Sequence, residues 1–198
     1  MKVALLRHAK AVPSAPECED FDRPLRPKGL RQCGELAATF PHPHALLLSA
    51  EVEIWCSPAL RTRQTLEYWQ SLSAQGLEHV SAPVSAQGLE HVSGHGSEPV
   101  QAWAKKTACY FPAWMYLATA NRIYSEIMAR ETDTPLLLIG HNNGLSELAQ
   151  MLTGDSSLYL GTCHHLVLNA PDSLTEQNLP GAWQSLGLWC PKDDAASI

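Results

Sequence analysis

Two histidines and an arginine stand at the ends of short apolar segments of this 198-residue chain. Arg7 and His8 directly follow the apolar residues 3–6, and His141 follows a second apolar run at residues 135–139. Strands that are apolar on both faces are typical of a buried parallel sheet, and ligands of such sheets bind at the carboxyl edge. We therefore expect both imidazoles and Arg7 at one edge of a sheet.

A third segment, residues 56–65, brings a further cation to the same edge. Its sequence is Cys-Ser-Pro-Ala-Leu-Arg-Thr-Arg-Gln-Thr, directly after an expected strand at residues 52–55. Ser57 suits the N-cap of a helix and Pro58 its first turn, which places Arg61 at or near that turn. The free N–H groups of a helix start and a guanidinium both favour an anionic ligand.

Two imidazoles and at least two guanidinium groups in one place suit the binding and transfer of a phosphoryl group. Arginine binds phosphate oxygens bidentately, and a neutral imidazole is a candidate nucleophile for phosphoryl transfer. A second imidazole, when protonated, stabilises charge on the transferred group. We expect no metal and no other cofactor, because cationic side chains supply that stabilisation. An isolated Arg-His pair more often has a structural role, so the hypothesis depends on all three segments meeting.

The elements that would position these residues alternate between strand and helix. Strands are expected at residues 3–6, 52–55, 111–116, 135–139, 163–168 (as an edge strand) and 187–190. Helices are expected at residues 30–40, 57–72, 100–108, 117–129 and 145–152. This order predicts an α/β fold, with a mostly parallel central sheet and helices on both faces.

Composition limits the function classes. With 45% hydrophobic and 17% charged residues the chain is globular, and residues 1–198 suit a single domain. The net charge of −6 argues against nucleic acid or a membrane surface as a partner. The six cysteines show no zinc spacing, and neither a signal peptide nor a membrane span is apparent, so we expect a reduced, cytoplasmic protein.

A tandem duplication lies between the second and the third expected strand. The nine residues 73–81, Ser-Ala-Gln-Gly-Leu-Glu-His-Val-Ser, recur at residues 85–93. Two copies do not make a solenoid, and length changes cost little in a surface loop. We interpret residues 73–96 as a duplicated surface loop, which either has no function or forms a lid that selects the substrate.

Four segments together match the motifs of one family. Residues 5–11 contain Arg-His-Ala, residues 56–65 fit S-P-x-x-R-x-x-Q-T, residues 138–142 contain Gly-His-Asn, and residues 23–29 fit R-P-L-x-x-x-G. These segments resemble the motifs of the histidine phosphatase superfamily, also called the phosphoglycerate-mutase-like fold. The last of them resembles the SixA branch, the small phosphohistidine phosphatases.

The resemblance implies a role for each matching residue. His8 would be the nucleophile, phosphorylated during turnover, and Arg7, Arg61 and His141 would form the phosphate pocket, joined by Arg23. The expected activity is hydrolysis of a phosphohistidine protein or of a small phosphomonoester, without a metal.

The sequence departs from many relatives in one respect, because no general acid can be placed. Glu78, Glu90 and Glu98 are the carboxylates in the expected region, and each is interpreted as a solvated loop residue. Arg26 and Arg63 match no motif and are also expected in solvent. The SixA branch manages without the acid, because a good leaving group needs little protonation.

Two alternatives stay open at this point. The chain could be a non-catalytic phosphate-binding module of the same fold, or a broad small-molecule phosphomonoesterase. Mutase activity is disfavoured because no segment matches the mutase cap. The sequence predicts neither the physiological substrate nor the oligomeric state.

Overall fold

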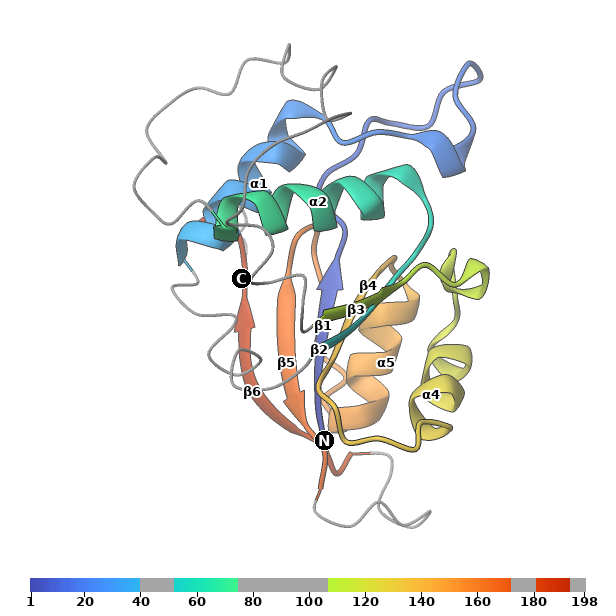
Figure 1. The fold of residues 1–198 in the computed structure, drawn as a ribbon, viewed down its shortest axis with the longest axis vertical. Helices are drawn as coiled ribbons and strands as arrows, with labels where there is room; N and C mark the ends of the chain where they lie inside the picture. The colour runs from blue at the N-terminus through green and yellow to red at the C-terminus, as the bar shows by residue number, and fades with distance from the viewer. Residues whose placement is uncertain (40–51, 75–106, 172–180, 193–198) are drawn as a thin grey trace.

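One mixed sheet organises the described part of the computed structural model, which comprises residues 1–39, 52–74, 107–171 and 181–192 (Figure 1). The strands are β1 (Lys2–Arg7), β2 (Val52–Cys56), β3 (Thr107–Tyr110), β4 (Leu136–Gly140), β5 (His165–Asn169) and β6 (Gln184–Trp189). They lie in the order β3-β2-β4-β1-β5-β6. The pairings from β3 to β1 are parallel, and β5 and β6 are added antiparallel. The expected mostly parallel sheet is confirmed.

The strand register brings the ends of three strands to one level. Leu6 of β1 and Cys56 of β2 both pair with Ile139 of β4, the strand between them. The residues that follow these three strands therefore leave the sheet at the same carboxyl edge. This is the geometry that the sequence analysis requires for His8 and His141 to meet.

Helices cover both faces of the sheet, as expected. The longer helices are α1 (Pro27–Thr39), α2 (Leu60–Ala74), α4 (Ala120–Met128) and α5 (Gly144–Thr153). Figure 1 shows α1 and α2 together on one side and α4 and α5 on the other. Alternate residues of one strand point to opposite faces. In β1, Leu6 accordingly packs in the cluster of α1 and α2, while Leu5 packs in the cluster of α4 and α5.

Three expected elements are wrong. Residues 107–108, expected at the end of a helix, belong to strand β3, and residues 100–106 lie outside the described ranges. The expected strand at residues 111–116 is replaced by the 3-10 turn η5 (Ala113–Met115), which begins after Pro112. Strand β5 is not an edge strand, since its first four residues are buried and the half-exposed β6 covers its outer side.

The duplicated segment is described only at its start. Residues 73–74 form the last positions of α2, and the rest of residues 73–96 lies outside the described ranges, as do residues 40–51. Its interpretation as a loop or lid therefore stays a prediction. In the described part of the chain, no helix has the length and apolar character that crossing a membrane requires.

Candidate active site

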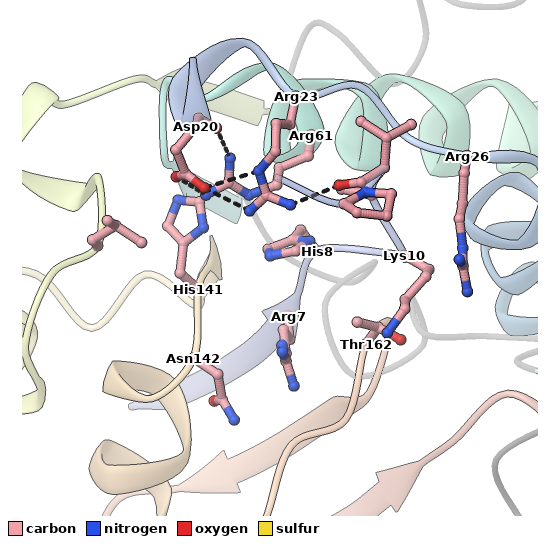
Figure 2. A pocket seen from close by; sticks show the side chains of 14 residues that line it. Arg7, His8, Lys10, Asp20, Arg23, Arg26, Arg61, His141, Asn142 and Thr162 are labelled. Carbon is pink, nitrogen blue, oxygen red and sulfur yellow. Dashed lines mark hydrogen bonds and ion pairs between the residues drawn. The ribbon is translucent and has the colours of Figure 1, made fainter. Parts of the chain in front are cut away.

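A cavity of about 580 Å³ lies where β1 and β4 end (Figure 2). All five residues predicted for the site line it: Arg7, His8, Arg23, Arg61 and His141. They come from four separate parts of the chain, so the fold brings them together as the motifs require.

The imidazole of His8 is fixed in one orientation at the end of β1. Its backbone N–H donates to the Gly140 carbonyl of β4 at 3.1 Å, and its Nδ1 lies 2.8 Å from the Ala9 carbonyl. A carbonyl can only accept, so Nδ1 carries the proton of the neutral ring, and the lone pair is on Nε2. The side chain lines the cavity and is 9% exposed. His8 thus has the tautomer and the access of a nucleophile.

His141 lies next to His8 in the lining of the cavity. The two ring centroids are 5.3 Å apart, with an angle of 61° between the ring planes. The Ser57 hydroxyl shares a hydrogen bond of 2.7 Å with Nε2 of His141, and the Ser57 N–H donates to Ile139 at 2.9 Å. Nδ1 of His141 is buried and has no hydrogen-bond partner among the described residues. Ser57 thereby links β2, β4 and the second imidazole.

Burial favours the neutral form of both imidazoles near pH 7. Burial lowers the pKa of His8 to about 4; the hydrogen bond to Ala9 opposes this shift, and the charge of Arg61 adds to it. Burial also lowers the pKa of His141 to about 3, with His8 and Arg61 contributing. A bound dianion would oppose these shifts, because an anion favours the charged form of a neighbouring imidazole.

Asp20 holds two guanidinium groups of the cavity, and sequence analysis missed it. Arg61 is 1% exposed and donates to both the backbone carbonyl and the carboxylate of Asp20, the latter at 2.9 Å. Arg23 donates to the same carboxylate at 2.6 and 2.8 Å, and the Tyr116 hydroxyl donates at 2.7 Å. The spacing of Asp20 three residues before Arg23 was the one signal in the sequence.

These contacts keep the carboxyl group of Asp20 ionised. Burial alone would raise its pKa, but the hydrogen bonds from Tyr116, Arg23 and Arg61 outweigh burial and hold the pKa well below its usual range. Asp20 therefore has no proton to donate as a general acid near neutral pH. The glutamates considered as acids in the sequence, Glu78 and Glu90 among them, lie outside the described residues.

Helices α1 and α2 hold the loop that follows His8. Thr65 of α2 accepts a hydrogen bond from the Ala9 N–H at 3.0 Å, and Gln64 accepts one from the Leu25 N–H at 2.8 Å. The Gln-Thr pair of the 56–65 motif thus fixes the segments after His8 and Arg23. In α1, a Cβ on Gly29 would overlap the Lys10 carbonyl, so only glycine permits the close approach of helix and loop.

The remaining cations of the cavity are Arg7, Lys10 and Arg26, of which sequence analysis selected only Arg7. Arg7 donates to the Leu160 carbonyl at 2.8 Å, which ties it to the segment before β5. Lys10 and Arg26 also line the cavity, so the expectation that Arg26 is merely solvated is wrong. Arg63 does follow its expectation, because it is exposed, with its guanidinium 5.7 Å from the Phe111 ring centre.

Comparison with known proteins finds the same fold in solved phosphatases. A protein of Agrobacterium tumefaciens assigned as the phosphohistidine phosphatase SixA is similar with a TM-score of 0.64 and 22% sequence identity, over 96% of this chain and 98% of that one. The protein histidine phosphatase SixA complexed with tungstate gives 0.62 and 18% identity, over 98% and 99% of the two chains.

One sequence relative adds to these structures. An uncharacterized chloroplastic protein of Arabidopsis thaliana is 27% identical over an alignment of 204 positions, which covers 96% of this chain and 78% of that protein. No protein-family model matches the chain. The structural similarities confirm the phosphoglycerate-mutase-like fold that the sequence resemblance implies.

Proposed function

We propose that this protein is a histidine phosphatase, which hydrolyses a phosphohistidine or a small phosphomonoester through a phosphorylated His8. One observation carries the proposal. The proton of the neutral His8 ring is held on Nδ1 by the Ala9 carbonyl, which leaves Nε2 as the nucleophilic atom beside two arginines and a second imidazole. The tungstate complex of a SixA protein with this fold supports an oxyanion ligand.

In the first step, Nε2 of His8 attacks phosphorus and forms an N–P bond while the bond to the leaving group breaks. Arg61 and Arg23 stabilise the charge on the equatorial oxygens, and His141 donates a hydrogen bond to one of them when it is protonated. In the second step, water attacks the same phosphorus, the N–P bond breaks, and inorganic phosphate leaves. His8 returns to its neutral form.

The charge state of Asp20 favours substrates with good leaving groups. An alkoxide leaving group needs a proton, and the sole carboxyl group lining the described cavity is ionised through its bonds to Arg23, Arg61 and Tyr116. An aryl phosphate or a phosphohistidine releases a weaker base, which needs less protonation. We therefore expect phosphohistidine and aryl phosphates to be cleaved faster than alkyl phosphates.

We also propose that turnover needs no metal. In the proposed mechanism Arg23 and Arg61 neutralise the phosphoryl oxygens, which is the role that a metal would otherwise have. Among the described residues, no three histidine, cysteine or acidic side chains group as metal ligands. Activity should persist in EDTA.

Rapid-quench labelling tests the covalent intermediate. With a ³²P-labelled aryl phosphate, the wild-type protein should acquire label that is stable in base and labile in acid, and His8→Ala should acquire none. Label retained in His8→Ala would refute the assignment of the nucleophile. Binding of phosphate or vanadate without label or turnover would favour the non-catalytic phosphate-binding module instead.

Two arginines of one helix provide a matched control. Arg61 lines the cavity and is 1% exposed, whereas Arg63, two residues later, is exposed. Arg61→Gln should lower kcat/KM by roughly a hundredfold or more, because it removes a donor to the transferred phosphoryl group. Arg63→Gln should change kcat/KM by less than about twofold.

A further inference from the structure

The cavity has more positive charge than one phosphate group requires. Five cationic side chains and one carboxylate line it, so its formal charge is four positive when both histidines are neutral. A phosphate dianion compensates two of these charges. The whole chain has a net charge of −6, so the excess in the cavity is local.

Four of the five cations form two groups on different sides of His8 in Figure 2, while Arg7 lies apart from both and donates to the Leu160 carbonyl. Arg23 and Arg61 lie on the side of His141, where Asp20 pairs with both of them. Lys10 and Arg26 lie on the other side, and within the described chain neither forms an ion pair. Nε of Arg26 is also buried without a hydrogen-bond partner among these residues. Lys10 and Arg26 are therefore available to bind an anion.

A short antiparallel ribbon holds Lys10 and Arg26 together. Ala11 and Leu25 form a β-bridge, and the Arg26 N–H donates to the Lys10 carbonyl at 3.0 Å. Lys10 and Arg26 are thus direct cross-strand neighbours. Like charges opposite one another are destabilising in an antiparallel pair. An anion bound between them would remove that repulsion.

The volume of the cavity allows such an anion beside the reacting phosphate. About 580 Å³ falls within the range of small-molecule sites and exceeds what a single phosphate group occupies. Thr162 also lines the cavity, and its hydroxyl, which accepts from Gln32 at 3.0 Å, can donate to an anion.

We propose that Lys10 and Arg26 form a second anion site, and that the substrate is a small molecule with a phosphate and a second anionic group, either a phosphate or a carboxylate. The assignment of the first anion to the side of His8 rests on the proposed function. The second anion would be bound by the ammonium of Lys10 and the guanidinium of Arg26, and would not react.

Non-hydrolysable ligands that have either one or two anionic groups test this site without turnover. Calorimetry at pH 7.5 and constant ionic strength would compare propylphosphonate with the α,ω-alkylenebisphosphonates of two to five carbons and with the matching ω-phosphonocarboxylates. At the best chain length, we expect the second anionic group to tighten binding about tenfold or more. A larger gain with the bisphosphonate identifies the second group as a phosphate, and an equal gain also admits a carboxylate.

Charge-matched variants separate the local site from general attraction. In Lys10→Gln/Arg26→Gln, the gain should fall to within about threefold, whereas Lys2→Gln/Arg122→Gln should retain it. Lys10 is exposed, so Lys10→Gln alone serves if the double variant does not fold, and it should reduce the gain about threefold.

Two results would overturn the proposal: no gain at any chain length, or a gain that the cavity variants leave unchanged. The proposed function fails separately. A protein that binds bisphosphonates through Lys10 and Arg26 but never forms phospho-His8 would refute the phosphatase mechanism and support the second anion site.

Discussion

At the scale of single residues, the charge of Asp20 affects how tightly the cavity binds an anion. Its carboxylate pairs with Arg23 and Arg61 and accepts from Tyr116, so the guanidinium groups that would bind phosphate already have a negative partner. A carboxylate in this place both orients the guanidinium groups and repels an incoming anion. The two effects can be separated by a substitution that keeps the shape and removes the charge.

Asp20→Asn should tighten the binding of inorganic phosphate while it lowers stability. Removing one negative charge a few ångströms from the bound anion is worth about 1 kcal/mol at an exposed site, or roughly fivefold in affinity. Because Arg61 is buried and loses a charge-assisted partner, the free energy of unfolding should fall by about 1–2 kcal/mol. Product inhibition and urea denaturation measure the two quantities.

Asp22→Asn is the matched control for this prediction. Asp22 lies in the same 3-10 turn, η1 (Asp20–Asp22), and is exposed outside the cavity lining. It should leave phosphate affinity and stability within experimental error of the wild type. Weaker phosphate binding in Asp20→Asn would mean that orientation of the arginines outweighs repulsion, contrary to our expectation.

At the scale of elements, the fit of α1 against the loop after β1 sets the position of His8. The Lys10 carbonyl accepts from the Arg26 N–H and faces Gly29 so closely that a Cβ on Gly29 would overlap it. For the second glycine of α1, Gly34, no atom of the described residues beyond its own helix lies within 4 Å of the position that its Cβ would take. One helix thus contains a restrictive glycine and a permissive one.

The two glycines of α1 should respond in opposite ways to alanine. Gly29→Ala should cost about 1–3 kcal/mol of stability, because backbone atoms cannot yield like a flexible side chain. It should also lower kcat/KM, since the displaced Lys10 is two residues from His8. Gly34→Ala should stabilise the protein by about 0.5–1 kcal/mol through helix propensity and leave activity unchanged. Thermal denaturation and aryl phosphate kinetics test both variants.

A uniform response of the two glycine variants would contradict this account. If both were stabilising with full activity, the loop after β1 could adjust to the added methyl group without cost. The close contact of helix and loop would then not be what positions His8.

At the scale of the whole molecule, the sequence predicted those parts of the site that depend on local pattern. His8 and His141 each follow an apolar strand closely, so position along the chain specifies position at the sheet edge. Asp20 and Arg26 could not be predicted in this way. Asp20 contacts Arg61, which lies 41 residues later in the sequence. Arg26 lines the cavity because the antiparallel ribbon pairs it with Lys10.

The same distinction explains the errors in the fold. The apolar strands at residues 3–6 and 135–139 could be predicted, because a run of apolar residues is a local pattern. Strand β3 has four residues and depends on pairing with β2, which no pattern within it encodes. The place of β5 in the sheet likewise depends on β6, a strand whose half-exposed residues gave little signal of their own.

Because two buried histidines are kept neutral in the folded protein, the free energy of unfolding of the whole molecule depends on pH. The pKa of His8 is lowered to about 4 and that of His141 to about 3, mainly by burial. An unfolded chain has ordinary imidazoles that take up protons near pH 6.5. Between that pH and the lower native pKa values, the unfolded state binds more protons, so the free energy of unfolding must fall as the pH is lowered.

We therefore expect the wild-type protein to lose stability steeply between pH 7 and pH 5. The expected loss is about 2 kcal/mol for each of the two histidines, because each pH unit below about 6.5 contributes about 1.4 kcal/mol per group. In His8→Asn/His141→Asn, this part of the pH dependence should disappear, whatever the variant's stability at pH 7. Urea denaturation at both pH values measures the difference, and the single variants apportion it. Equal pH dependence in wild type and double variant would show that the two imidazoles are not held neutral, which would remove the basis for His8 as a nucleophile near neutral pH.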